Sequence, residues 1–195
     1  MAEERSKSEI VRLFVALDLP EFVRAEIGAW SKRELTDPAL RPVAVENLHI
    51  TLAFLGSRPF GDVEPVAEAV RDCAGAAPIV NLMDVAARPA RRPRVLGLPA
   101  ISPGAEILQA ALSERLAAED LYKPEKRPFW PHVTVARVRS EGRGSRRPMR
   151  VEKLPDDLPA SLLEPFLGVR LALYRSELQP SGARYVPLAQ VELPG

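Results

Sequence analysis

Residues 49–53 of the chain read His-Ile-Thr-Leu-Ala, and residues 132–136 read His-Val-Thr-Val-Ala. The protein has two histidines in all, and each is followed two positions later by a threonine. Because successive side chains of a β-strand point to opposite faces, each segment predicts a strand with an imidazole and a hydroxyl on one face and apolar side chains toward the core. We expect the alanine that closes each segment to keep the polar face low and to leave room for a ligand.

The rest of the chain alternates predicted strands and helices. Apolar periodicity predicts further strands over Val11–Leu19, Leu48–Leu55, Ile79–Ala86, Val95–Ile101, His132–Arg139, Val169–Leu178 and Arg184–Leu193. It predicts helices over Glu21–Leu35, Asp62–Ala76 and Gly104–Leu121, with Asp62 and Ser102 as N-caps. Several strand pairs have links of hairpin length, which favours an α+β fold with antiparallel or mixed pairing over a doubly wound parallel sheet.

Composition sets broad limits on the class of protein. The chain has 195 residues, 46% of them hydrophobic and 27% charged, as in ordinary globular domains. The early apolar run Leu13–Leu17 is too short for a signal segment, so we expect a cytoplasmic protein without a membrane span. A single cysteine, Cys73, excludes an internal disulfide and a cysteine-based metal cluster. The net charge of +1 argues against a protein that coats nucleic acid non-specifically.

Positive charge nevertheless gathers in two segments. Seven basic residues against two acidic ones lie between Arg137 and Lys153, including the loop Arg139–Pro148, and a second cluster lies between Arg88 and Arg94. Each segment can hold phosphate, or it can be a solvated surface. Strict alternation places Arg137 on the strand face opposite His132, and a β-bulge would be needed to bring it to the same face.

Two imidazoles beside two hydroxyls suit phosphodiester hydrolysis. Histidine has a pKa near 6.5, so one copy can be protonated while another is neutral close to pH 7. One imidazole can then activate water while the other protonates the leaving oxygen, and hydroxyls can hold the phosphate oxygens without a metal ion or another cofactor. Unrelated core histidines are a poor account of a repeated pattern. A metal site would have few ligands, and a serine or cysteine nucleophile has no local signature.

The paired motifs, together with residues 12–17, Pro131 and the segments 174–176 and 182–185, resemble the two-histidine phosphoesterase superfamily and, within it, its LigT-like branch. The resemblance implies a bilobal α+β fold in which two antiparallel sheets, flanked by helices, contribute one motif each to a central cleft. Residues 1–195 would form a single bilobal catalytic domain.

The resemblance also implies a reaction and residue roles. The reaction is hydrolysis of a 2′,3′-cyclic phosphate, at an RNA 3′ end or on a nucleoside, to a 2′-phosphomonoester. His49 would be the proton donor and His132 the proton acceptor, although the two motifs are too alike for the residues themselves to assign the roles. Thr51 and Thr134 match phosphate-holding positions.

Two aromatic residues complete the expected site. Phe14 can stack on a nucleobase, or it can be a core aromatic, and Tyr185 is a further candidate for substrate binding. We expect a monomer. Two alternatives remain open: 2′-5′ RNA ligation or 2′-5′ oligonucleotide cleavage by the same acid-base pair, and a non-catalytic module that binds RNA ends.

Overall fold

The computed structural model describes residues 9–142, 144–179 and 182–195. Its strands are β1 (Ile10–Asp18), β2 (Leu40–Pro42), β3 (His49–Pro59), β4 (Ile79–Leu82), β5 (Ala86–Arg88), β6 (Val95–Ile101), β7 (His132–Val138), β8 (Phe166–Leu167), β9 (Arg170–Gln179) and β10 (Gly182–Glu192). Its helices are α2 (Glu21–Glu34), α3 (Val63–Asp72), α4 (Pro103–Ala118) and α5 (Ala160–Leu163), with short 3-10 helices η1 (Val45–Asn47) and η2 (Phe60–Asp62).

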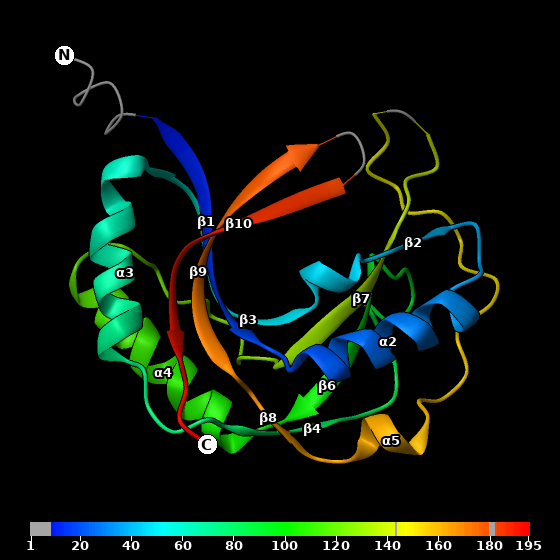
Figure 1. The fold of residues 1–195 in the computed structure, drawn as a ribbon. Coiled ribbons are helices and arrows are strands. Elements are labelled where there is room, and N and C mark those ends of the chain that lie inside the picture. Colours follow the sequence, from blue (N-terminus) through cyan, green and yellow to red (C-terminus); the bar gives the residue numbers. More distant parts are fainter. Residues whose placement is uncertain (1–8, 143, 180–181) are drawn as a thin grey trace.

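The strands form two halves that are joined by a narrow contact between β3 and β7, which is called the waist below. Their order is β10-β9-β1-β3-β7-β6-β4-β8, with β2 beside β7 and β5 beside β6, and every pairing among the described residues is antiparallel. A single residue pair, Ile50 with Val133, connects β3 of the first half to β7 of the second. The two expected sheets are therefore continuous as one open, ten-stranded sheet (Figure 1).

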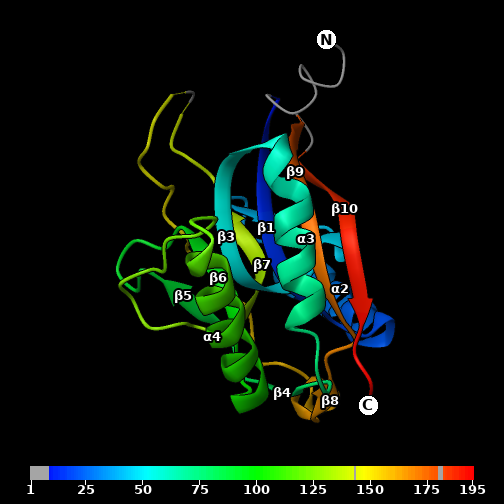
Figure 2. The same cartoon turned by 90° about the vertical axis from the view of Figure 1, so that its left-hand side faces the viewer.

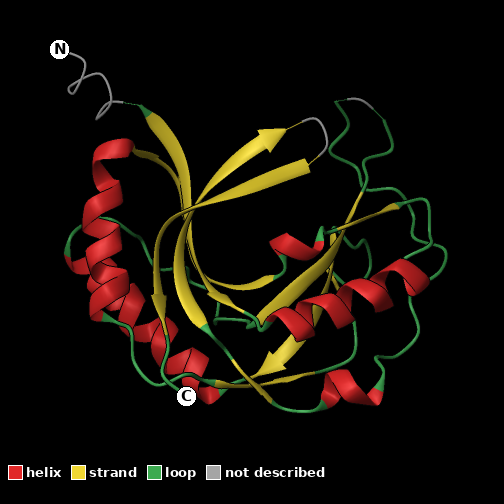
Figure 3. Ribbon diagram, in the orientation of Figure 1, coloured by secondary structure: helices red, strands yellow, loops and turns green. Residues whose placement is uncertain are grey.

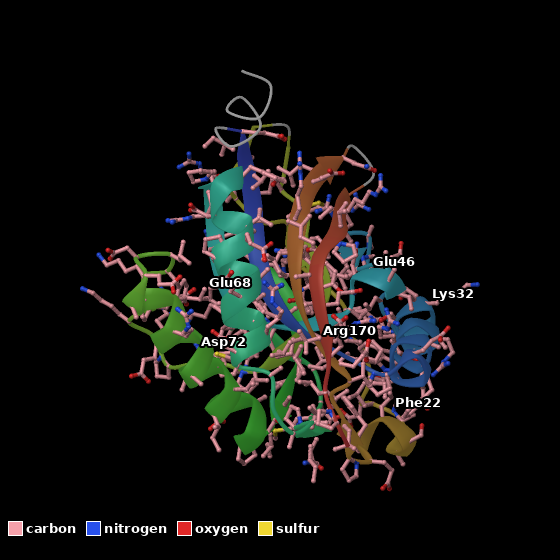
Figure 4. The ribbon with its side chains drawn as sticks, turned by 60° about the vertical axis from the view of Figure 1, so that its left-hand side comes forward. Phe22, Lys32, Glu46, Glu68, Asp72 and Arg170 are labelled. Atoms are coloured by element: carbon pink, nitrogen blue, oxygen red, sulfur yellow. The ribbon has the colours of Figure 1, made fainter. Side chains whose placement is uncertain are left out.

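Helices lie on two sides of this sheet. α3 and α4 lie together on one side, where α3 contacts β9 and β10 and α4 contacts β3 and β4 (Figures 1 and 2). α2 and α5 lie on the other side of the molecule (Figure 3). The exposed side chains Glu68 and Asp72 mark the outer face of α3, and Phe22 and Lys32 mark that of α2 (Figure 4). No helix of the described segments is long and apolar enough to cross a membrane.

One hydrophobic core runs through both halves. Its completely buried members include Leu13 and Leu17 of β1, Ile50 of β3, Leu98 of β6 and Val133 of β7. Because these side chains fill the core side of the waist, the polar side chains that alternate with them must lie on the other face of the sheet.

The two predicted helix caps have different outcomes. The Ser102 hydroxyl accepts a hydrogen bond from the Ala105 N–H, at 3.3 Å, so this prediction is confirmed. Asp62 occupies the N-cap position of α3, as predicted, but η2 precedes the helix and the Asp62 side chain makes no capping hydrogen bond. Its carboxylate instead accepts a hydrogen bond of 2.7 Å from the Arg58 side chain, which competes for the same oxygen atoms.

Several predicted boundaries change. The strand expected over Ile79–Ala86 is two strands with an interruption at Asp84, whose carboxylate accepts a hydrogen bond from the Leu158 N–H. The helix expected to reach Ala76 ends at Asp72. β2, β8 and α5 have 3, 2 and 4 residues, too few to produce a periodic apolar pattern. Tertiary contacts therefore determine these short elements.

Candidate active site

The two motif strands meet at one point, and that point assembles the site. β3 and β7 pair antiparallel through Ile50 and Val133, which are completely buried. Antiparallel pairing then brings the histidine of each motif next to the threonine of the other motif. These pairs lie one position along the strands from Ile50 and Val133, on the opposite face of the sheet. All four side chains are half-buried. These four residues, His49, Thr51, His132 and Thr134, are called the quartet below.

Each motif strand has a β-bulge at the same place. The register of β1 with β3 skips Leu52, and the register of β6 with β7 skips Val135. A bulge adds one residue to a strand and reverses the facing of the residues that come after it. It therefore brings Phe54 and Arg137, each five residues after its histidine, to the polar face.

These bulges correct two expectations. Arg137 lines the same pocket as His49, so the strict alternation that excluded it does not hold in this strand. Ala53 and Ala136 do not keep the polar face low: both are buried members of the core and neither lines the pocket. The pocket above the motifs is instead lined by residues from both halves of the sheet.

The pocket above the quartet has a volume of about 350 Å³. His132 lines an adjoining pocket of about 430 Å³, which shares Thr51 and Phe54 with the first. The cavities therefore continue across the quartet from one histidine to the other. The walls of the first pocket include Phe14, His49, Thr51, Phe54, Thr134, Arg137 and Tyr185.

Both imidazoles are held in the same way. Nδ1 of His49 lies 2.8 Å from the carbonyl oxygen of Asn47, and Nδ1 of His132 lies 2.8 Å from that of Trp130. Since a carbonyl oxygen only accepts, Nδ1 must carry the proton in each ring, and Nε2 of the neutral ring is an acceptor. Nε2 of His49 is 2.9 Å from Oγ1 of Thr51, whose hydroxyl can donate to it.

Aromatic rings support each imidazole. His49 stacks on Phe14 with 5.0 Å between ring centroids, and His132 stacks on Trp130 with 3.9 Å. Gly97 allows the second stack to lie close to β6, because a Cβ atom there would lie 3.0 Å from the His132 ring. Phe14 is only 3% exposed, so its ring mainly supports His49. Tyr185 contacts the edge of Phe14 and is half-buried.

The surroundings of the two imidazoles differ in charge. Burial lowers the pKa of His49 to about 4; the nearby Asp18 carboxylate opposes this effect, and Arg137 adds to it. Burial also lowers the pKa of His132, and there the nearby charges of Arg137 and Arg88 act in the same direction. Both rings are therefore neutral near pH 7, and a carboxylate that favours protonation lies near His49.

Asp18 belongs to a network beneath His49. Its carboxylate accepts hydrogen bonds from Nε of Arg170 at 2.8 Å and from the Tyr174 hydroxyl at 2.9 Å. Tyr174 also stacks on Phe14, at 5.3 Å, and burial beside Asp18 raises the pKa of Tyr174 to about 12. Arg170 lies at the start of β9, on the side of the sheet seen in Figure 4. The network therefore joins Phe14 and Asp18 of β1 to Arg170 and Tyr174 of β9, beneath the His49 ring.

The lowered pKa of the half-buried His49 predicts a loss of stability in acid. Between pH 6.5 and about 4 the unfolded chain takes up a proton at this position and the folded chain does not. The free energy of unfolding should therefore fall across this range by on the order of 2–3 kcal/mol from His49 alone. Urea unfolding at pH 7 and at pH 4.5 measures this loss, with His49→Gln as the reference. Equal losses in the wild type and His49→Gln would show that His49 titrates normally.

The remaining basic residues separate into different surfaces. Arg91 and Arg92 meet Arg147 and Arg150 around a groove of about 420 Å³ that shares no lining residue with the quartet pocket. Of the loop Arg139–Pro148, Glu141, Arg147 and Pro148 line this groove, and Arg143 lies outside the described residues. Within the described segments, no group of three or more His, Cys, Asp or Glu side chains is arranged to hold a metal ion.

Sequence reasoning missed several pocket residues. Asn47 and Trp130 each lie two residues before a histidine and hold its ring through a backbone carbonyl, a contact that does not depend on residue type and leaves no signal in the sequence. Arg41 comes from β2, which is too short to predict. Phe54, 44% exposed, lies under the guanidinium of Arg12 at 4.8 Å and reaches the pocket only because of the bulge.

A bilobal antiparallel sheet that joins two His-x-Thr strands, with an arginine beside them, defines a phosphoesterase of the two-histidine class. Comparison with known proteins gives the particular family. Residues 17–96 match the family described as LigT like Phosphoesterase. The chain belongs to this LigT-like phosphoesterase family.

The matches to similar proteins extend over more than nine-tenths of the chain. The RNA 2′,3′-cyclic phosphodiesterase of Escherichia coli K12 is 33% identical over 186 residues, which are 93% of this chain and 96% of that protein. A crystal structure from Thermus thermophilus superposes with a TM-score of 0.75 at 30% identity, and covers 94% of this chain and 98% of its own. The crystal structure of Escherichia coli LigT complexed with 3′-AMP superposes with a TM-score of 0.73 at 27% identity. The match covers 96% of this chain and 100% of that chain.

Proposed function

We propose that this protein hydrolyses the 2′,3′-cyclic phosphate at RNA 3′ ends, or on nucleosides, and leaves a 2′-phosphomonoester. The observation that supports this most strongly is the quartet of two imidazoles and two hydroxyls on one face of the waist. Relatives named RNA 2′,3′-cyclic phosphodiesterase at about 30% identity over most of the chain support the same reaction.

In the proposed reaction His132 is the base and His49 the acid. Neutral His132 takes a proton through Nε2 from water as the water oxygen bonds to phosphorus. The bond from phosphorus to O3′ breaks, and protonated His49 donates its Nε2 proton to O3′. Among the nearby charges, Asp18 favours a proton on His49, Arg137 disfavours a proton on both rings, and Arg88 disfavours one on His132. The bound phosphate anion further favours the protonated form of His49.

The other pocket residues hold the substrate. The hydroxyls of Thr51 and Thr134 donate hydrogen bonds to the non-bridging phosphate oxygens, and the Arg137 guanidinium lies on the same face to balance their charge. Phe14 and Tyr185 remain our candidates for the nucleobase contact. Tyr185 is the more accessible ring, and Phe14 additionally supports His49.

Turnover in a chelator tests this proposal. A nucleoside 2′,3′-cyclic phosphate incubated with the protein in excess EDTA should be converted to the 2′-phosphate at the rate seen without EDTA, because the acid and the base are both side chains. Phosphorus NMR or chromatography against 2′- and 3′-phosphate standards identifies the product. A strict need for added metal would contradict the mechanism. A 3′-phosphate product would contradict the assignment of O3′ as the leaving group.

The 2′-5′ alternatives use the same groups with a different nucleophile or leaving group. A second RNA carrying a 5′-hydroxyl would replace water on the His132 side, where an adjoining pocket of about 430 Å³ is lined by Tyr122, Phe129 and Trp130. Adding a 5′-hydroxyl oligonucleotide to the cyclic phosphate reaction measures this directly. Joined product in excess of hydrolysed product would favour the ligase.

We also propose that residues 1–195 act as one bilobal catalytic domain, as a monomer and in the cytoplasm. The core that continues through both halves supports the single domain. The unpaired Cys73, which is the sole cysteine of the chain, suits a reducing compartment. Both histidines and both threonines of the quartet come from one chain, so the proposed site is complete in a monomer.

A further inference from the structure

A second pocket of about 550 Å³ continues from the quartet pocket along the other side of Arg137. It shares Arg41, Asn47, Arg137 and Tyr185 with the quartet pocket, so the two are open to each other. The second pocket adds Arg184, at the start of β10, to its walls. Three arginines from three strands therefore surround a space that adjoins the proposed cyclic phosphate site.

These three arginines line one pocket and make no ion pair within the described residues. Arg41 and Arg137 are direct partners across the β2–β7 ladder, and like charges in that arrangement repel. None of the three forms an ion pair with another described residue, whereas Arg58, Arg170 and Arg175 all do. Among the residues that line the second pocket, the acidic one is Glu46 of η1, an exposed side chain (Figure 4). The pocket thus has the charge expected of an anion site.

Asn47 connects the second pocket to the reacting groups. Its carbonyl oxygen holds His49, and its side-chain amide donates a hydrogen bond of 2.8 Å to the carbonyl oxygen of Ala183. This bond holds the β9–β10 hairpin, and therefore Arg184 and Tyr185, next to η1. An RNA end that places its cyclic phosphate at the quartet and its last base near Tyr185 would have its next phosphate beside the arginines.

We propose that Arg41, Arg137 and Arg184 bind the phosphodiester on the 5′ side of the terminal nucleotide. The preferred substrate is then an RNA end of at least two nucleotides, and not a free nucleoside cyclic phosphate. Guanidinium groups suit this role because their planar donors bind phosphate oxygens in pairs. This inference rests on the proposed function and specifies its substrate.

The test compares two substrates within each protein variant. The ratio of kcat/KM for a dinucleotide 2′,3′-cyclic phosphate to that for the corresponding nucleoside 2′,3′-cyclic phosphate should be about 10 in the wild type, as expected of charge-assisted hydrogen bonds. Arg41→Gln and Arg184→Gln should each lower this ratio several-fold. Because a ratio is measured within one preparation, a smaller folded fraction does not change it.

Two controls separate phosphate recognition from other effects. Arg150→Gln, in the groove beside Arg91 and Arg92, removes the same charge away from the second pocket and should leave the ratio unchanged. A dinucleotide with an uncharged methylphosphonate linkage keeps both bases, and it should lose the advantage over the nucleoside.

The outcomes distinguish this inference from the proposed function. Hydrolysis of both substrates at equal kcat/KM would overturn the inference and leave the proposed function in place. An unchanged ratio in both Arg41→Gln and Arg184→Gln, or full preference for the methylphosphonate, would also overturn it. Failure to hydrolyse either substrate would overturn both.

Discussion

Replacing His49 or His132 with alanine should lower kcat/KM for a nucleoside 2′,3′-cyclic phosphate by a factor of about 10² to 10⁴ each. Each change removes one proton-transfer group from the transition state, and factors of this size are usual for general acid or base catalysis. Both rings are half-buried beside the pocket, so the fold should tolerate their loss. Circular dichroism and the urea midpoint check folding, and initial rates measure the effect.

The pH dependence of the same variants tests the assignment of roles. The wild-type profile of kcat/KM should be bell-shaped, since it needs neutral His132 and protonated His49. His132→Ala should lose the acidic limb, and His49→Ala should lose the basic limb. The opposite result would exchange the roles, and a near-normal rate in either variant would remove that residue from catalysis.

Replacing Thr51 or Thr134 with valine should lower kcat by a factor of about 10² to 10³ each. Valine keeps the shape of threonine but cannot donate to a phosphate oxygen, and the loss of one preorganised donor has effects of this size. In Thr51→Val the ring of His49 also loses the hydroxyl that lies 2.9 Å from its Nε2. Steady-state kinetics with saturating cyclic nucleotide measure kcat separately from KM.

The chain contains a matched control for these variants. Thr36 is exposed after α2 and does not line the pocket. Thr36→Val makes the same chemical change there and should leave kcat unchanged. A kcat within twofold of the wild type in both Thr51→Val and Thr134→Val would show that the hydroxyls do not stabilise the transition state.

Local patterns predicted most of the regular structure. β6 has its predicted bounds Val95–Ile101, and Ser102 caps α4, because both signals depend on a few consecutive residues. Asp62 has its predicted N-cap position but makes no capping hydrogen bond, and a side chain four residues earlier uses its carboxylate. Capping and alternation are thus reliable where no other side chain or neighbouring strand competes with them.

The repeated His-x-Thr pattern by itself determined the pairing of the two motifs and the facing of their first three residues, since side-chain alternation is a property of the strand alone. The tertiary structure decided the facing of the residues after each threonine. The bulges at Leu52 and Val135 depend on the register with neighbouring strands, and they bring Phe54 and Arg137 into the pocket.

Contacts between distant segments were also decided only in the folded chain. The cross-strand pair Arg41 and Arg137, and the bond from Asn47 to Ala183, join residues that are separated by about half of the chain or more. No local pattern encodes such contacts, because they depend on how the two halves join at Ile50 and Val133. The sequence by itself therefore determined the reacting groups, and the tertiary structure decided the arginines and aromatic rings that surround them.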